Sequence, residues 1–156
     1  MVTTAQEIPD IEVKKHTNWL TSSLGDVKFG DNFDQSALEK QVRSYLATRQ
    51  LISKYGADFV GVKCQPELSD GYVTQCVSHM LTNGMVDADG SKQAVVHACE
   101  SDADGALTMQ ILHLLSAGSP TALMDIRLFN PQQGTWLLAN CGALAASFYA
   151  NERDAS

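Results

Sequence analysis

The segment HACESDADGALTMQILHLLSAGSPTALMDIR, residues 97–127, contains a complete strand–helix–strand pattern. A short apolar run ends in its first residues, and a helical pattern then spans 104–117 and stops before Gly118, a residue that commonly ends helices. The run TALMDIRL at 121–128 predicts another strand, because apolar residues without strict alternation are typical of strands that are buried on both faces.

The same kind of unit occurs on both sides of this segment. The sequence predicts further helices at 34–55, 70–82 and 142–150. It predicts further strands at 58–64, 94–99 and 135–140. Strands separated by helices of ten or more residues indicate parallel βαβ units. We therefore expect an α/β fold, a three-layer domain with a mainly parallel central sheet, over residues 34–156. Residues 1–33 show no clear period and are predicted to be an irregular N-terminal segment.

Composition narrows the function classes. The chain has 156 residues, which suits one domain, and a net charge of −7 from 18 acidic and 11 basic residues. Because the basic residues form no run, we expect neither nucleic acid nor an anionic membrane as a partner. We find no signal peptide, no apolar run long enough to span a membrane and no CxxC motif, so we expect a cytoplasmic protein with reduced thiols.

Polar side chains follow the predicted strands. Gln65 comes after the first strand, Glu100 after the second, Asp125 late in the third, and Asn140 ends the fourth. In parallel sheets, ligands bind beyond the carboxyl ends of the strands, and neighbouring strands lie about 4.8 Å apart. Two carboxylates there can share a hard divalent cation such as Mg²⁺ or Mn²⁺. The alternative is that Asp125 is satisfied by backbone N–H groups or by Arg127.

Other polar residues of this region have plainer interpretations. Asp102 and Asp104 suit the start of the helix at 104–117, where acids are favoured, although they could also support a metal site. Lys63 is either a solvated strand end or the partner of an acid or a substrate. The cysteines lack the close spacing of zinc ligands, so buried thiols that pack as small apolar groups are expected.

Three stretches together resemble a known family. They are GVKCQPELSDGYVTQC at 61–76, ACESDADGALTMQILHLLSAGSPTALMDIR at 98–127 and NCGA at 140–143, and they are similar to the L-fucose isomerase/L-arabinose isomerase superfamily, in particular its L-fucose isomerase-like branch. The resemblance covers roughly residues 55–150. It implies that Glu100 and Asp125 bind Mn²⁺ and carry the catalytic proton transfer, and that Gln65 contacts the substrate.

The function implied by the resemblance is metal-dependent interconversion of an aldose and a ketose through an ene-diol, with a monosaccharide as substrate. Which carboxylate is the base stays open. The family takes its third metal ligand, a histidine, from a C-terminal domain, and an N-terminal domain helps to bind the sugar; neither is found here. We therefore expect a middle-domain fragment of a larger, homo-oligomeric isomerase, inactive as an isolated chain. The alternative is a non-catalytic sugar-binding or regulatory module built on the same scaffold.

A domain separated from its neighbours should expose apolar surface. The candidates are the segment 1–33, with Trp19, Leu20 and Phe29, and the region after residue 128, with Phe129 and Trp136.

Overall fold

A computed structural model of the chain describes residues 1–23, 27–31, 33–140, 144–145 and 147. The helices among these residues are α1 (Val2–Glu7), α2 (Asp10–Ser23), α3 (Gln35–Tyr55), α4 (Glu67–Gly71), α5 (Cys76–Asn83) and α6 (Ala103–Leu115). The strands are β1 (Phe59–Val62), β2 (Val86–Asp87), β3 (Gly90–Ser91), β4 (Val96–Cys99), β5 (Asp125–Asn130) and β6 (Thr135–Ala139). The last helix expected at 142–150 falls largely outside the described residues.

Helix α3 is the longest helix and confirms the prediction for residues 34–55. The Asp34 carboxylate accepts a hydrogen bond from the N–H of Ala37 at 2.8 Å, which satisfies a donor at the start of the helix. Gly56 ends the helix with φ = 61°, the left-handed conformation that glycine adopts without strain. Between these ends, the recurrence of Leu38, Val42 and Tyr45 places one face of the helix in the core.

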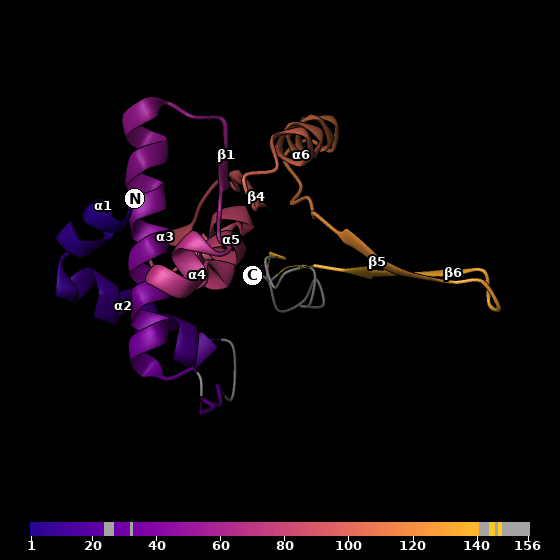
Figure 1. Cartoon of the computed structure of the whole chain (residues 1–156). Coiled ribbons are helices and arrows are strands. Elements are labelled where there is room, and N and C mark those ends of the chain that lie inside the picture. Colours follow the sequence, from indigo (N-terminus) through magenta and orange to yellow (C-terminus); the bar gives the residue numbers. More distant parts are fainter. Residues whose placement is uncertain (24–26, 32, 141–143, 146, 148–156) are drawn as a thin grey trace.

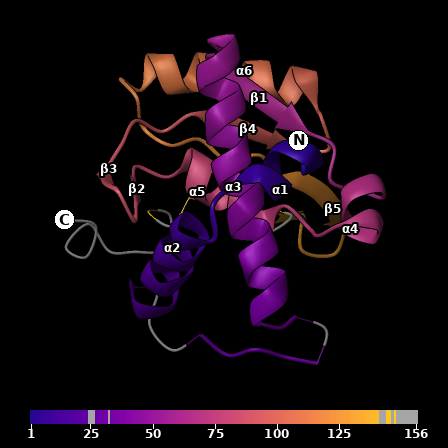
Figure 2. The same ribbon diagram turned by 90° about the vertical axis from the view of Figure 1, so that its left-hand side faces the viewer.

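The expectation of an irregular segment over residues 1–33 is wrong for its first two thirds. Residues 2–7 and 10–23 form α1 and α2, which pack on α3 (Figure 2). The apolar positions of α2 are sparse, since its buried face combines Val13 and Leu20 with polar residues, and the sequence period was therefore weak. Leu20 is buried rather than exposed.

The parallel pair β1–β4 lies at the centre of the fold. Phe59 pairs with Val96 and Val62 with Cys99, as predicted for the first and second strands. Helix α6 packs on this pair, and α5 packs on β4 and against α3. Figure 1 shows α6 and α3 on opposite sides of the two strands, with α5 beside β4. The chain therefore has an α/β fold in which helices cover both faces of a parallel sheet.

One helix was predicted over 70–82, but the structure has α4 and α5 with a break between them. The break is stabilised from α3 by Gln41, which is buried. Its Oε1 accepts a hydrogen bond from the N–H of Val77 at 2.7 Å, and its Nε2 donates to Thr74 Oγ1 at 3.0 Å. A side chain distant in sequence thus caps the start of α5, which local periodicity does not reveal.

The third and fourth predicted strands are present, but their expected place in the parallel sheet is wrong. β5 and β6 pair antiparallel with each other as a separate two-stranded sheet, and the ribbon of Figure 1 shows them extending away from the helices. Residues 131–134 are the whole connection between them. A parallel crossover needs a dozen or more residues, so this short connection permits only a hairpin.

Candidate functional site

The turn between β4 and α6 positions Glu100 by an unusual backbone. Glu100 and Ser101 have φ angles of 58° and 54°, in the left-handed region that residues with side chains rarely adopt. The turn lies so close to β1 that a Cβ on Gly61 would come within 3.2 Å of the Ser101 Cα. Asp102 then starts α6, because its carboxylate accepts from the N–H of Gly105 at 2.8 Å. This confirms the prediction that Asp102 begins the helix.

The Glu100 carboxylate joins the ends of the two parallel strands. Its Oε2 accepts a hydrogen bond from the backbone N–H of Gln65 at 3.1 Å, and its Oε1 accepts from the Cys99 thiol at 3.4 Å. Gln65 and Glu100 therefore meet at the carboxyl edge of β1 and β4, as their strand-end positions predicted. The hydrogen bond restricts the carboxylate to one orientation over this edge.

Asp125 reaches the same place by a different route. It begins β5 instead of ending a strand of the central sheet. Its Oδ2 accepts from Arg127 Nη2 at 2.9 Å, which is the alternative that the sequence had left open. The two side chains are 51% and 55% exposed, respectively, so the ion pair is weak and opens at little cost in free energy.

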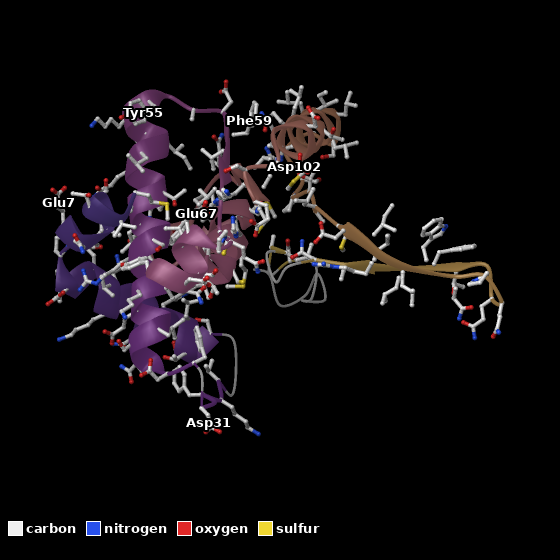
Figure 3. All side chains as sticks on the ribbon, in the orientation of Figure 1. Glu7, Asp31, Tyr55, Phe59, Glu67 and Asp102 are labelled. Carbon is white, nitrogen blue, oxygen red and sulfur yellow. The ribbon has the colours of Figure 1, made fainter. Side chains whose placement is uncertain are left out.

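Glu100 and Asp125 line one cavity of about 400 Å³. The cavity has acidic and amide side chains at its edge and buried residues at its base, and its lining consists of Gln65, His97, Cys99, Glu100, Asp102, Met109, Leu123, Asp125, Ile126, Arg127 and Asn140. Figure 3 labels Asp102 at the junction of β4 and α6, next to the segment that leads to β5. All four polar residues predicted at strand ends thus contribute to one cavity, whose oxygen atoms suit sugar hydroxyls or a hard cation.

His97 lies at the base of this cavity and was not predicted as part of it. Its ring is buried against His79, with ring centroids 4.0 Å apart, and neither ring has a hydrogen-bond partner among the described residues. Burial lowers the pKa of His79 to about 4. Burial, with a smaller contribution from His79, holds the pKa of His97 well below its usual range. Both rings are therefore neutral at physiological pH. The only sequence signal was a histidine within an apolar strand.

The remaining predicted residues have structural partners. Lys63 forms an ion pair with Glu67 at 2.8 Å on the surface, so it is paired with an acid. Asp104 lies in the first turn of α6. Cys64 and Cys99 are buried, as expected for thiols that pack in the core, and Cys141 lies outside the described residues. Within the described part of the chain, no cysteine belongs to a group of three residues close enough to hold a metal ion.

Comparison with known proteins gives a partial match. No family model matches the chain. Over 119 residues, the chain is 28% identical to a protein named sulfoquinovose isomerase from Alkalicoccus urumqiensis, an alignment that covers 74% of this chain and 25% of that protein. The chain therefore spans about a quarter of the length of the curated relative it matches. Among the described residues, no helix is long and apolar enough to cross a membrane.

Proposed function

We propose that the chain is a domain of a sugar isomerase and that the cavity at the end of β1 and β4 is its contribution to the active site. The observation that carries this proposal is that Gln65, Glu100 and Asp125, chosen from the sequence motif, line one cavity although they come from three separate segments. The relative named as an isomerase agrees with this function at the level of the reaction class.

The donor set fits a hard divalent cation. Glu100 and Asp125 offer carboxylate oxygens, and the amides of Gln65 and Asn140 line the same cavity. We propose that the two carboxylates hold Mn²⁺, with water completing the coordination. When bound, such an ion polarises the sugar carbonyl and stabilises negative charge on the neighbouring oxygens.

The protein's own groups would then bind the sugar and move the proton. A carboxylate can remove a proton from one sugar carbon and return it to the next, as aldose–ketose interconversion through an ene-diol requires. Glu100 is fixed by the N–H of Gln65, whereas Asp125 is restrained only by an exposed ion pair. The Gln65 amide, which lines the same cavity, would then hydrogen-bond a sugar hydroxyl.

The test is calorimetry with Mn²⁺ on the wild-type chain and three variants. Because two carboxylates are only part of the coordination shell, we expect weak binding, and removal of one ligand in Asp125→Asn or Glu100→Gln should weaken it by about tenfold or more. Asp104→Asn is the matched control, since Asp104 is an exposed acid on α6 that does not line the cavity. Equal affinity in Asp125→Asn and wild type would remove Asp125 from the proposed site.

Turnover is tested with Mn²⁺ and aldoses that include L-fucose and sulfoquinovose. Because the chain spans a quarter of its relative, we expect no conversion by the chain alone, since lost positioning of the substrate costs orders of magnitude in rate. Measurable turnover would show that the site is complete within these residues.

A second candidate is a sugar-binding module without catalysis. The Asp125–Arg127 ion pair favours it, because Arg127 occupies a carboxylate that the metal would need. This function predicts sugar binding that is independent of Mn²⁺ and insensitive to Asp125→Asn.

A further inference from the structure

A second cluster of potential ligands lies far from the cavity described above, on the other side of the core. Glu12 and His16 come from α2, four residues apart and therefore on one face of the helix. Asp89 lies in the tight turn between β2 and β3. Figure 2 shows α2 beside α3 with the β2–β3 hairpin next to them. One ligand atom from each of the three side chains lies within 4.8 Å of the others.

His16 has an unsatisfied nitrogen that faces this cluster. The ring is fully buried, and its Nδ1 is 3.0 Å from the backbone carbonyl oxygen of Glu12. A carbonyl oxygen only accepts, so Nδ1 carries a proton, and Nε2 is the nitrogen left to bind a metal ion. Nε2 has no hydrogen-bond partner within the described part of the chain and lies 3.7 Å from Asp89 Oδ2. A metal ion between them would satisfy Nε2, and it would share Asp89 Oδ2 with Arg49, whose Nη1 donates to that oxygen at 2.6 Å.

We propose that Glu12, His16 and Asp89 bind a divalent transition-metal ion such as Zn²⁺. Zinc bonds to its nitrogen and oxygen ligands about 2.0–2.1 Å away, so two ligands of one tetrahedral ion lie about 3.3 Å apart. A small movement of the exposed Asp89 carboxylate brings the 3.7 Å between Nε2 and Oδ2 to that distance. Imidazole with carboxylates favours Zn²⁺ and its neighbours over Mg²⁺ or Mn²⁺, which prefer oxygen alone. Glu12 and Asp89 also line a surface pocket of about 350 Å³, through which the ion and its water ligands can enter.

The charges around the site permit binding but limit its strength. Asp89 accepts hydrogen bonds from Lys15 and Arg49, each at 2.6 Å. These two cations, first Lys15 and then Arg49, lower the pKa of Asp89 to about 2, so the carboxylate is ionised. The buried carboxylate of Asp87 also contacts Arg49 at 3.1 Å. Three acids thus face two bases, and the exposed Lys15 side chain can move away when the metal binds.

The experiment follows the ring nitrogens of His16 by ¹⁵N NMR while Zn²⁺ is added to the Asp125→Asn variant. The Asp125→Asn substitution disables the metal site of the proposed function, so a negative result here bears only on the site at Glu12, His16 and Asp89. We expect Nδ1 of His16 to be protonated before addition and the Nε2 resonance to shift on binding, with a rise in the melting temperature. A Zn²⁺ titration that leaves the His16 ring resonances unchanged would overturn the proposal.

Three surface variants complete the test without altering the buried ring. Glu12→Gln should weaken Zn²⁺ binding by about tenfold or more, as expected for a lost ligand. Glu7→Gln is the matched control, an exposed acid at the end of α1 that does not belong to the cluster, and it should bind as wild type does. Lys15→Gln should tighten binding by about two- to fivefold, because it removes the competing cation. Equal affinity in Glu12→Gln and Glu7→Gln contradicts the site.

Discussion

Glu100 and Ser101 hold consecutive left-handed backbone conformations at the edge of the proposed active site. Such a conformation costs about 1–2 kcal/mol for a residue with a side chain, so the surrounding structure must compensate for it. Part of this compensation comes from packing, because the turn lies close against Gly61 of β1. The gain is orientation, because the turn directs the Glu100 carboxylate back over the N–H of Gln65. Strain of this kind is common at functional sites.

Ser101→Gly should therefore stabilise the fold. Glycine relieves the left-handed strain but adds entropy to the unfolded chain, which leaves a net gain of about 0.5–1 kcal/mol in the free energy of unfolding. Urea denaturation followed by circular dichroism measures it. Ser116→Gly is the control, because Ser116 has φ = −89° and glycine there should destabilise the fold. A loss of stability in both variants would mean that residue 101 is not strained.

At the scale of single residues, the sequence predicted the site unevenly. The meeting of Gln65 and Glu100 followed from their positions after two parallel strands. Asp125 was assigned to the same site for a topological reason that is wrong, since it begins a hairpin strand. The family motif also pointed to Asp125, which does line the cavity, although its role there stays a prediction. His97 was not predicted as part of the cavity, because the sequence around it does not show that the side chain of this strand residue lines a cavity.

At the scale of the elements, α5 and β4 are held together by polar groups in a buried environment. The Asn83 side chain accepts from the N–H of His97 at 3.0 Å and donates to its carbonyl oxygen at 2.9 Å. The ring of His97 packs against that of His79, and both rings are buried with no hydrogen-bond partner in the part of the chain that the structure describes. A proton on either ring would place an uncompensated charge in the core. The junction of α5 and β4 is therefore sensitive to acid.

Stability should fall as the pH falls from about 6.5 to about 4. His79 has an ordinary pKa of 6.5 when unfolded and about 4 when folded, so the unfolded chain binds more protons in this window. The free energy of unfolding then rises with pH, by up to about 1.4 kcal/mol per pH unit for each such histidine. Urea denaturation at several pH values should show this slope and a smaller one in His79→Leu.

Elements were predicted well where one local signal dominated. The long apolar period, the Asp34 cap and Gly56 together determine α3. The prediction for the segment before α3 was wrong because α2 relies on packing against α3 instead of on a strong period of its own. The pairing of β5 with β6 was open to prediction, since a connection of residues 131–134 is too short for a crossover, but the runs of apolar residues suggested a buried parallel strand.

At the scale of the whole molecule, exposed apolar side chains gather on α6 and on the β5–β6 hairpin. They include large residues on both elements, among them Leu107, Ile111, Leu112, Leu114, Leu115, Leu128, Phe129, Trp136, Leu137 and Leu138. An isolated two-stranded hairpin is marginally stable in water, and apolar side chains on both faces are typical of a strand pair that is covered. The expectation of exposed apolar surface after residue 128 is thus confirmed.

The isolated chain should therefore self-associate through this surface. Sedimentation velocity over a range of concentrations should show a weight-average mass that rises with concentration, because contact between copies removes apolar area from water. Leu137→Lys places a charge on the hairpin at a side chain that is 56% exposed, and it should shift the distribution toward monomer. Ile11→Lys is the matched control, since Ile11 is 72% exposed on α2 and lies apart from the hairpin. If both variants associate as wild type does, the hairpin is not the contact surface. If the wild-type chain stays monomeric at high concentration, its exposed apolar side chains do not drive association, and the prediction is wrong.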